Sequence, residues 1–158
     1  MGPVTIVLCG EALRGDDGVG PAVAASLPAS VTGTATVRLV PGLEPADLLD
    51  LPPNVAVIVV DAVSGIAPGD LVVLPLEELT TVALPARVLS SHRLPIDEVV
   101  GLASLLGRPP RGTFLGMGAS RFAPGTGLSQ PLLDALPRLL LLIESELVRL
   151  SAHPEVAR

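Results

Sequence analysis

Residues 4–21 read VTIVLCGEALRGDDGVGP, and this stretch decides the fold. It opens with a mostly apolar, β-branched run from Val4 to Cys9 that stops at Gly10. Such a run predicts a strand buried on both faces, as in a parallel sheet. After the next loop, apolar residues return at helical spacing and predict a helix over residues 17–27. The chain therefore begins with a strand, a loop and a helix.

Alternating strand and helix patterns continue along the chain. We expect further strands at residues 34–40, 55–60, 70–74 and 113–117, and helices at residues 44–51, 95–106 and from 130 onward. The connection before residues 70–74 is too short for a crossover helix, so that strand is expected at an antiparallel edge. Residues 80–91 are expected to form a loop. This order predicts an α/β three-layer sandwich with a mostly parallel twisted sheet of about five strands flanked by helices.

The composition indicates one globular domain with an aliphatic core. Of the 158 residues, 49% are hydrophobic, and the aromatic residues are two Phe with no Tyr or Trp. This composition disfavours a base-stacking platform. The single cysteine, Cys9, excludes an intramolecular disulfide. We expect one α/β domain over residues 1–150 and a polar tail over residues 151–158.

Charge and hydropathy exclude several classes of partner. The net charge is −6 with only 10 Lys and Arg residues, which disfavours nucleic acid and anionic membranes. Apolar runs such as residues 55–60 are far shorter than the ~20 residues that a membrane span requires. The first residues lack the basic start and apolar stretch of a signal peptide. We therefore expect a cytoplasmic protein, and we expect it to be a monomer.

Three side chains are candidates for chemistry because they follow strands, at the edge of the sheet where α/β folds bind ligands. Asp17 comes after the first strand, Asp61 follows the apolar run 55–60, and His92 precedes the helix at 95–106. Two carboxylates and an imidazole suit a transition metal with open positions. Each residue also has a purely structural alternative: Asp17 as a helix N-cap, Asp61 as a turn cap and His92 as a hydrogen-bonded loop residue.

Other chemistries fit the sequence less well. The glycines around Asp17 lack the G-x-G-x-x-G spacing and a Walker lysine, and two carboxylates would repel a phosphate, so a nucleotide-binding domain rests on fold analogy alone. No G-x-S-x-G elbow supports a serine hydrolase built on His92. Cys9 is expected to be a small buried hydrophobe, and His153 is expected to be solvated.

Several motifs taken together resemble the hydrogenase maturation endopeptidases. They are residues 7–21 with GDDGVG at 15–20, VDAV at 60–63 with PGD at 68–70, SH at 91–92, LGRPP at 106–110 leading to LGM at 115–117, and GLS at 127–129. Their order and spacing agree across nearly the whole chain. The first two motifs are fairly specific when they occur together.

The resemblance implies an endopeptidase that removes the C-terminal extension of a nickel-iron hydrogenase large-subunit precursor after nickel insertion. It also implies a metal site of two acidic residues and a histidine, which by motif fall on Asp17, Asp61 and His92. The expected metal is nickel supplied by the substrate, and other divalent metals could occupy the site. The resemblance assigns no catalytic base.

The chain departs from the family pattern at two places. Glu11 stands where the family usually has Asn, and residues 116–119 lack the Glu-Pro or Gln-Pro often found there. The added carboxylate could tune the metal preference or mark a member that acts on a different hydrogenase group. The alternative function is a non-catalytic accessory module that senses nickel on the same fold.

Overall fold

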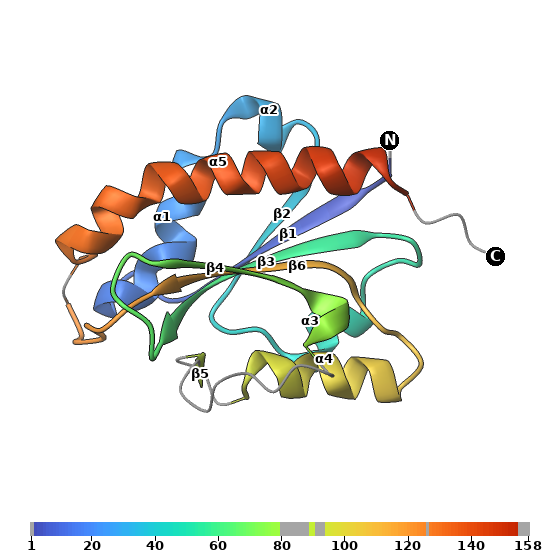
Figure 1. Cartoon of the computed structure of the whole chain (residues 1–158), viewed down its shortest axis with the longest axis horizontal. Coiled ribbons are helices and arrows are strands. Elements are labelled where there is room, and N and C mark those ends of the chain that lie inside the picture. Colours follow the sequence, from blue (N-terminus) through green and yellow to red (C-terminus); the bar gives the residue numbers. More distant parts are fainter. Residues whose placement is uncertain (1, 80–88, 91–93, 126, 155–158) are drawn as a thin grey trace.

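A six-stranded sheet lies between two layers of helices in the computed structural model of the chain (Figure 1). The structure describes residues 2–79, 89–90, 94–125 and 127–154, and side chains at 89 and 90 are not described. The predicted α/β class and the mostly parallel sheet are confirmed.

The sheet has the strand order β2-β1-β3-β6-β4. The strands are β1 (Val4–Cys9), β2 (Thr36–Val40), β3 (Ala56–Ser64), β4 (Leu71–Pro75), β5 (Leu89–Ser90) and β6 (Arg111–Gly118). Four of them, β2, β1, β3 and β6, run parallel, and β4 pairs antiparallel with β6 at the edge, as predicted. The short β5 pairs antiparallel with the end of β3. The carboxyl ends of the four parallel strands therefore meet at one edge of the sheet.

Helices cover both faces of this sheet (Figure 1). They are η1 (Gly15–Gly18), α1 (Val19–Ser26), α2 (Ala29–Thr32), α3 (Pro45–Leu49), η2 (Leu76–Glu78), α4 (Ile96–Leu105) and α5 (Gln130–Ala152). One buried cluster joins α1 and α5 to the sheet, and a second joins α3 and α4 to its other face. The result is the predicted three-layer arrangement.

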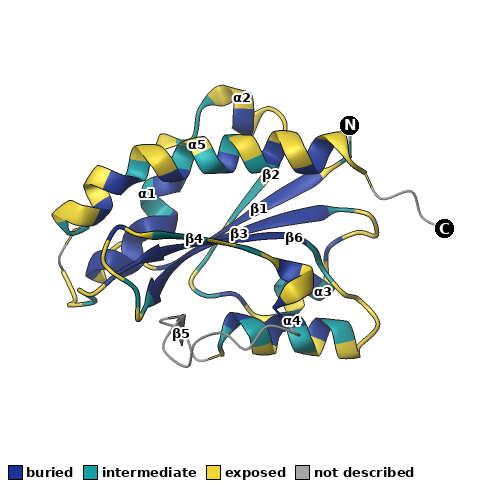
Figure 2. Ribbon diagram, in the orientation of Figure 1, coloured by how far each residue is buried: buried dark blue, intermediate teal, exposed yellow. Residues whose placement is uncertain are grey.

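The central strand β3 supplies both clusters. Ile58 and Val60 belong to the α1 and α5 side, whereas Val57 and Val59 belong to the α3 and α4 side. Successive side chains in a strand point to opposite faces, so a continuous apolar run is what a strand covered on both sides requires. Figure 2 shows the same distribution, with buried central strands and more exposed residues at the edges.

Several expected boundaries differ from the structure, and three of the differences bear on the site. The strand expected to stop before Asp61 continues to Ser64, because Ala62 and Val63 are also apolar and buried. The helix expected over residues 17–27 begins as the 3-10 turn η1 and becomes α-helical at Val19. Within the expected loop over residues 80–91, Leu89 and Ser90 form β5, and the other residues lie outside the described part of the chain.

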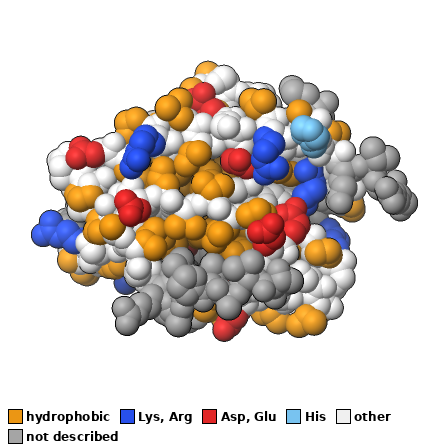
Figure 3. All heavy atoms as spheres, in the orientation of Figure 1, with side chains coloured by type: hydrophobic (Ala, Val, Ile, Leu, Met, Phe, Trp, Pro, Cys, Tyr) orange, Lys and Arg blue, Asp and Glu red, His pale blue; other side chains and the backbone are white. Residues whose placement is uncertain are grey.

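The helix α5 packs along one face of the sheet, with Ser129 as its predicted N-cap residue. It continues past Pro137 to Ala152, and Ser151 is buried. Residues 151 and 152, which we expected to open the polar tail, therefore belong to the helix. Figure 3 shows hydrophobic side chains on the surface between α5 and β4. No helix in the described ranges is long and apolar enough to cross a bilayer.

Candidate functional site

Asp17 lies just past the carboxyl end of β1, as the third residue of η1. Its side chain is buried, and its Oδ2 accepts a hydrogen bond of 3.0 Å from the backbone N–H of Glu11. The N-cap residues of η1 and α1 are Arg14 and Gly18, so the helix-capping alternative for Asp17 is wrong. Its carboxylate is instead held by the loop that leads out of β1.

Two glycines allow this turn to approach the end of β1. Gly10 has a φ of +128°, and a Cβ there would overlap the carbonyl oxygen of Asp17. At Gly20, in the first turn of α1, a Cβ would overlap the carbonyl oxygen of Cys9. Only glycine fits such close backbone approaches. The glycine-rich character of residues 10–20 therefore serves packing around Asp17 and does not form a phosphate loop.

Asp61 lies within β3 on the face covered by α3 and α4, between Val59 and Val63 of that cluster. It is 3% exposed, and its Oδ1 accepts a 2.8 Å hydrogen bond from the N–H of Ala62. The pairing of β3 with β1 ends at Val60, opposite Leu8, so Asp61 is the first residue of β3 beyond it. Because β3 continues to Ser64, the turn-capping alternative for Asp61 is also wrong.

Cys9 is the last residue of β1, the strand whose end lies next to both carboxylates. Cys9 is fully buried at the end of β1, as expected of a small hydrophobe. Burial raises the pKa of this thiol well above its ordinary value, and the negative charges of Asp61, Asp47 and Asp17 raise it further. Strand register and packing place both residues at this end of β1: Asp61 is one residue beyond Val60, the partner of Leu8, and the carbonyl oxygen of Asp17 lies against Gly10.

The third predicted ligand, His92, lies outside the described residues. Among residues 2–79, 89–90, 94–125 and 127–154, no group of three Asp, Glu, Cys or His side chains could hold a metal ion. The predicted set of Asp17, Asp61 and His92 therefore stays a prediction. Ser90, two residues before His92 in the sequence, pairs with Val63, which is two residues after Asp61.

Asp16 is a buried site residue whose role we did not predict. Its carboxylate accepts hydrogen bonds from the N–H of Ser129 at 2.7 Å, the hydroxyl of Ser129 at 3.0 Å, the N–H of Arg121 at 3.1 Å and the N–H of Ser120 at 3.3 Å. Burial tends to raise the pKa of this carboxyl, but the bonds from Ser129, Ser120 and Arg121 bring the pKa below its ordinary value. Asp16 is therefore a carboxylate that joins η1 to the connection between β6 and α5.

A pocket of about 730 Å³ opens beside the loop that follows β1. Its lining includes Glu11 and Arg14 from the loop after β1, and Leu43 and Asp47 from the region of α3. Leu94, before α4, also lines it. Glu11, whose N–H holds Asp17, is exposed there. The departure from the family pattern at position 11 thus puts a carboxylate on the wall of this pocket.

The other histidine of the chain, His153, is exposed at the end of α5, where its Nδ1 lies 3.1 Å from the carbonyl oxygen of Arg149. His153 and Asp17 lie at opposite ends of β1. The amino end of β1 is next to the end of α5, where the N–H of Gly2 donates to the carbonyl of Ser151. Asp17 follows the carboxyl end of the same strand. The prediction that His153 is solvated is confirmed.

Comparisons with known proteins agree with the fold and identify a family. The family model HycI, described as hydrogenase maturation protease, matches residues 32–146. That range contains Asp61 and His92 and begins after Asp17. No curated protein matches the sequence.

Several solved structures share the fold. The hydrogenase maturating endopeptidase HybD from E. coli superimposes with a TM-score of 0.69 at 21% identity, over 93% of both chains. The [NiFe] hydrogenase maturation protease HybD from Thermococcus kodakarensis gives a TM-score of 0.66 at 21% identity, over 90% of this chain and 97% of the other. These likenesses extend over most of the chain and include its sheet and flanking helices.

Proposed function

Because the chain belongs to the hydrogenase maturation protease family, we propose that it removes the C-terminal extension of a nickel-iron hydrogenase large-subunit precursor once nickel is in place. The nickel arrives with the precursor and is part of the substrate. Asp17, Asp61 and His92 are the proposed residues that recognise it. Recognition of this kind makes the installed metal a check on the maturity of the precursor.

The observation that carries this proposal is the convergence of two buried carboxylates at the end of β1. Asp17 comes from η1 and Asp61 from β3, yet Asp17 packs against Gly10 just after β1, and Asp61 is the first residue of β3 beyond its pairing with β1. Carboxylate oxygens together with an imidazole nitrogen form a donor set that a divalent transition metal accepts. The family pattern adds His92. The strand β5, which precedes His92 in the sequence, pairs with the end of β3.

The residues around the carboxylates hold them in fixed orientations. The N–H of Glu11 donates to Asp17, and the N–H of Ala62 donates to Asp61. A carboxylate that is already oriented loses less conformational entropy when it binds a ligand. The nickel ion would polarise the scissile carbonyl or a water molecule when it is bound here. The pocket lined by Glu11 and Arg14 offers room for a segment of the precursor.

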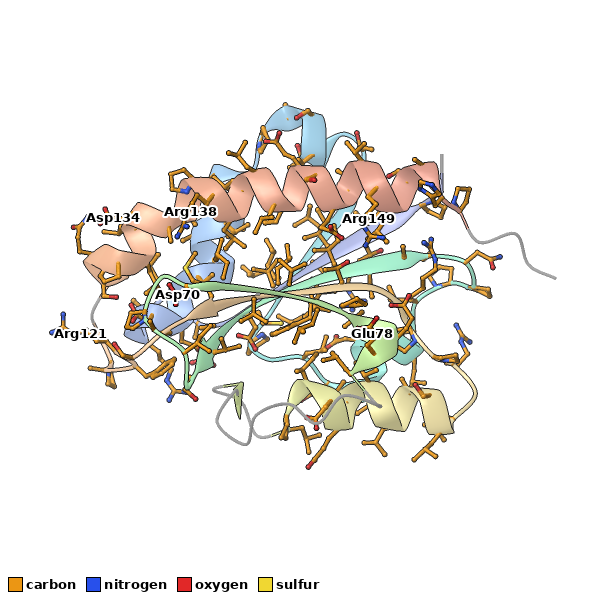
Figure 4. All side chains as sticks on the ribbon, in the orientation of Figure 1. Asp70, Glu78, Arg121, Asp134, Arg138 and Arg149 are labelled. Carbon is orange, nitrogen blue, oxygen red and sulfur yellow. The ribbon has the colours of Figure 1, made fainter. Side chains whose placement is uncertain are left out.

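The decisive experiment compares cleavage by matched variants. A nickel-loaded precursor is incubated with the wild-type protein and with Asp17→Asn, Asp61→Asn and His92→Ala, and loss of the extension is followed by intact-protein mass spectrometry. Each variant should cleave at least ~100-fold more slowly, because each removes one group that recognises the metal. Asp70→Asn is the control, since Asp70 is exposed at the start of β4 (Figure 4).

Unimpaired cleavage by all three variants would refute the assignment of these residues. If the wild-type protein binds the nickel-loaded precursor and never cleaves it, the accessory module that senses nickel becomes the better account. The mass of the precursor after incubation separates the two outcomes directly.

A further inference from the structure

Asp16 and Asp17 are neighbours in sequence, but their carboxylates have different partners. Both are buried in η1. A 3-10 turn has about three residues per turn, so consecutive side chains point in directions roughly 120° apart. The carboxylate of Asp17 accepts from Glu11 in the loop after β1, whereas that of Asp16 accepts from the connection between β6 and α5.

The bonds of Asp16 fix η1 against a distant part of the chain. Besides its four carboxylate bonds, the backbone N–H of Asp16 donates to the carbonyl of Arg121 at 2.6 Å. The N–H of Gly125 in the same connection donates to the carbonyl of Leu13 at 2.7 Å. The turn that carries Asp17 is therefore anchored on its far side as well as at the end of β1. Figure 4 shows Arg121 at the end of the molecule where the connection passes η1.

We propose that Asp16 is a positioning residue for Asp17: it locks η1 onto the connection between β6 and α5 and so fixes the direction in which the Asp17 carboxylate points. This inference rests on the proposed role of Asp17 in the site. Asp16 itself contributes no ligand, because its oxygens accept from Ser120, Arg121 and Ser129. It follows that Ser120, Arg121 and Ser129 control the direction of Asp17 although they are not ligands themselves.

The amide of Glu11 provides a readout that needs neither metal nor precursor. Its N–H donates to Oδ2 of Asp17, so its hydrogen-exchange rate reports whether that carboxylate stays in place. In Asp16→Asn an amide NH₂ group replaces one of the accepting oxygens and faces N–H donors. We expect exchange at Glu11 to accelerate at least ~10-fold through local opening of η1. Ser129→Ala, which removes one of the four bonds, should give a smaller acceleration in the same direction.

Glu146→Gln is the matched control, because it makes the same carboxylate-to-amide change at the other end of α5. Glu146 accepts a 2.6 Å bond from the hydroxyl of Thr113 and is paired with Arg149, so the control also loses buried hydrogen bonds. It should leave exchange at Glu11 as in the wild-type protein. Ni²⁺ titration by calorimetry adds a second readout, in which Asp16→Asn should bind at least ~10-fold more weakly and Glu146→Gln as the wild type does.

The proposal is overturned if Asp16→Asn and Ser129→Ala leave exchange at Glu11 unchanged, or if Glu146→Gln accelerates it equally. If Asp16→Asn does not fold, Ser129→Ala decides by the same criterion. If the wild-type protein fails to process any nickel-loaded precursor, the proposed function fails, but the exchange at Glu11 still tests the positioning of Asp17.

Discussion

The carbonyl oxygen of Asp17 lies against the α-carbon of Gly10, in the space that a side chain at position 10 would occupy. This contact joins the loop after β1 to the turn that carries the first candidate ligand. It depends on a backbone conformation, φ of +128°, that favours glycine.

Gly10→Ala should therefore destabilise the protein and displace Asp17. We expect the free energy of unfolding to fall by about 3 kcal/mol or more, since the Cβ adds both backbone strain and an overlap. Denaturant unfolding measures the effect. Gly101→Ala in α4 is the control, because a Cβ there meets open space, and it should be neutral or stabilising by up to ~1 kcal/mol. Equal stability of the two variants would show that the close approach is absent in solution.

Acid should weaken the attachment of α5 to β6. Burial tends to raise the pKa of Glu146, but hydrogen bonds from Arg149 and Thr113 and the charge of Arg149 bring it below its ordinary value. A carboxyl with a lower pKa in the folded state stabilises the fold above its unfolded pKa of about 4.3 and loses that contribution as the pH falls toward the folded value.

Urea unfolding from pH 7 down to pH 3 checks this contribution. Glu146→Gln should lower the free energy of unfolding by about 1–2 kcal/mol at pH 7, the low end for hydrogen bonds to a charged group because its partner Arg149 is half exposed. The difference from wild type should shrink below pH 4. Asp16, whose pKa is also lowered, keeps an acid-sensitive contribution in this variant. A difference that stays constant down to pH 3 would contradict the role of the Glu146 charge. Figure 4 shows Arg149 between α5 and the sheet.

Cys9 should be chemically inert and dispensable for cleavage. Its burial and the nearby carboxylates raise the pKa of the thiol, so little thiolate forms and reagents cannot reach it. We expect Ellman's reagent to modify the native protein at least ~100-fold more slowly than the protein unfolded in guanidinium. Cys9→Ala should keep its processing activity while losing about 1 kcal/mol of stability. Rapid modification of the folded protein, or loss of cleavage with the fold intact, would assign Cys9 a direct role.

Local patterns predicted the fold well because its elements have strong signals of their own. The apolar run Val4–Cys9 forms β1 with the predicted bounds, and Ser129 stands at the N-cap position of α5 as expected, although its hydroxyl donates to Asp16 and not to the helix. The predicted end of β3, at residue 60, was wrong because we expected the strand to stop before the charged residue Asp61. A carboxylate near the end of a buried strand can remain in the ladder when it accepts a neighbouring N–H, as Asp61 does from Ala62.

The site was only partly predictable for a different reason. Asp17 and Asp61 follow strands, and the topology of an α/β sheet brings such positions to one edge. The role of Asp16 depends on partners more than 100 residues away along the chain, at Ser120, Arg121 and Ser129. No spacing rule connects these residues. The one available signal was the pair of adjacent aspartates, of which only one can point toward a given ligand.

The dependence of cleavage on nickel tests the central claim most directly. The same precursor, prepared with and without nickel, is incubated with the wild-type protein, and the loss of its C-terminal extension is measured by intact-protein mass spectrometry. Our account predicts complete loss of the extension from the nickel-loaded precursor and no loss from the nickel-free form. Cleavage of the nickel-free precursor at the same rate would contradict it.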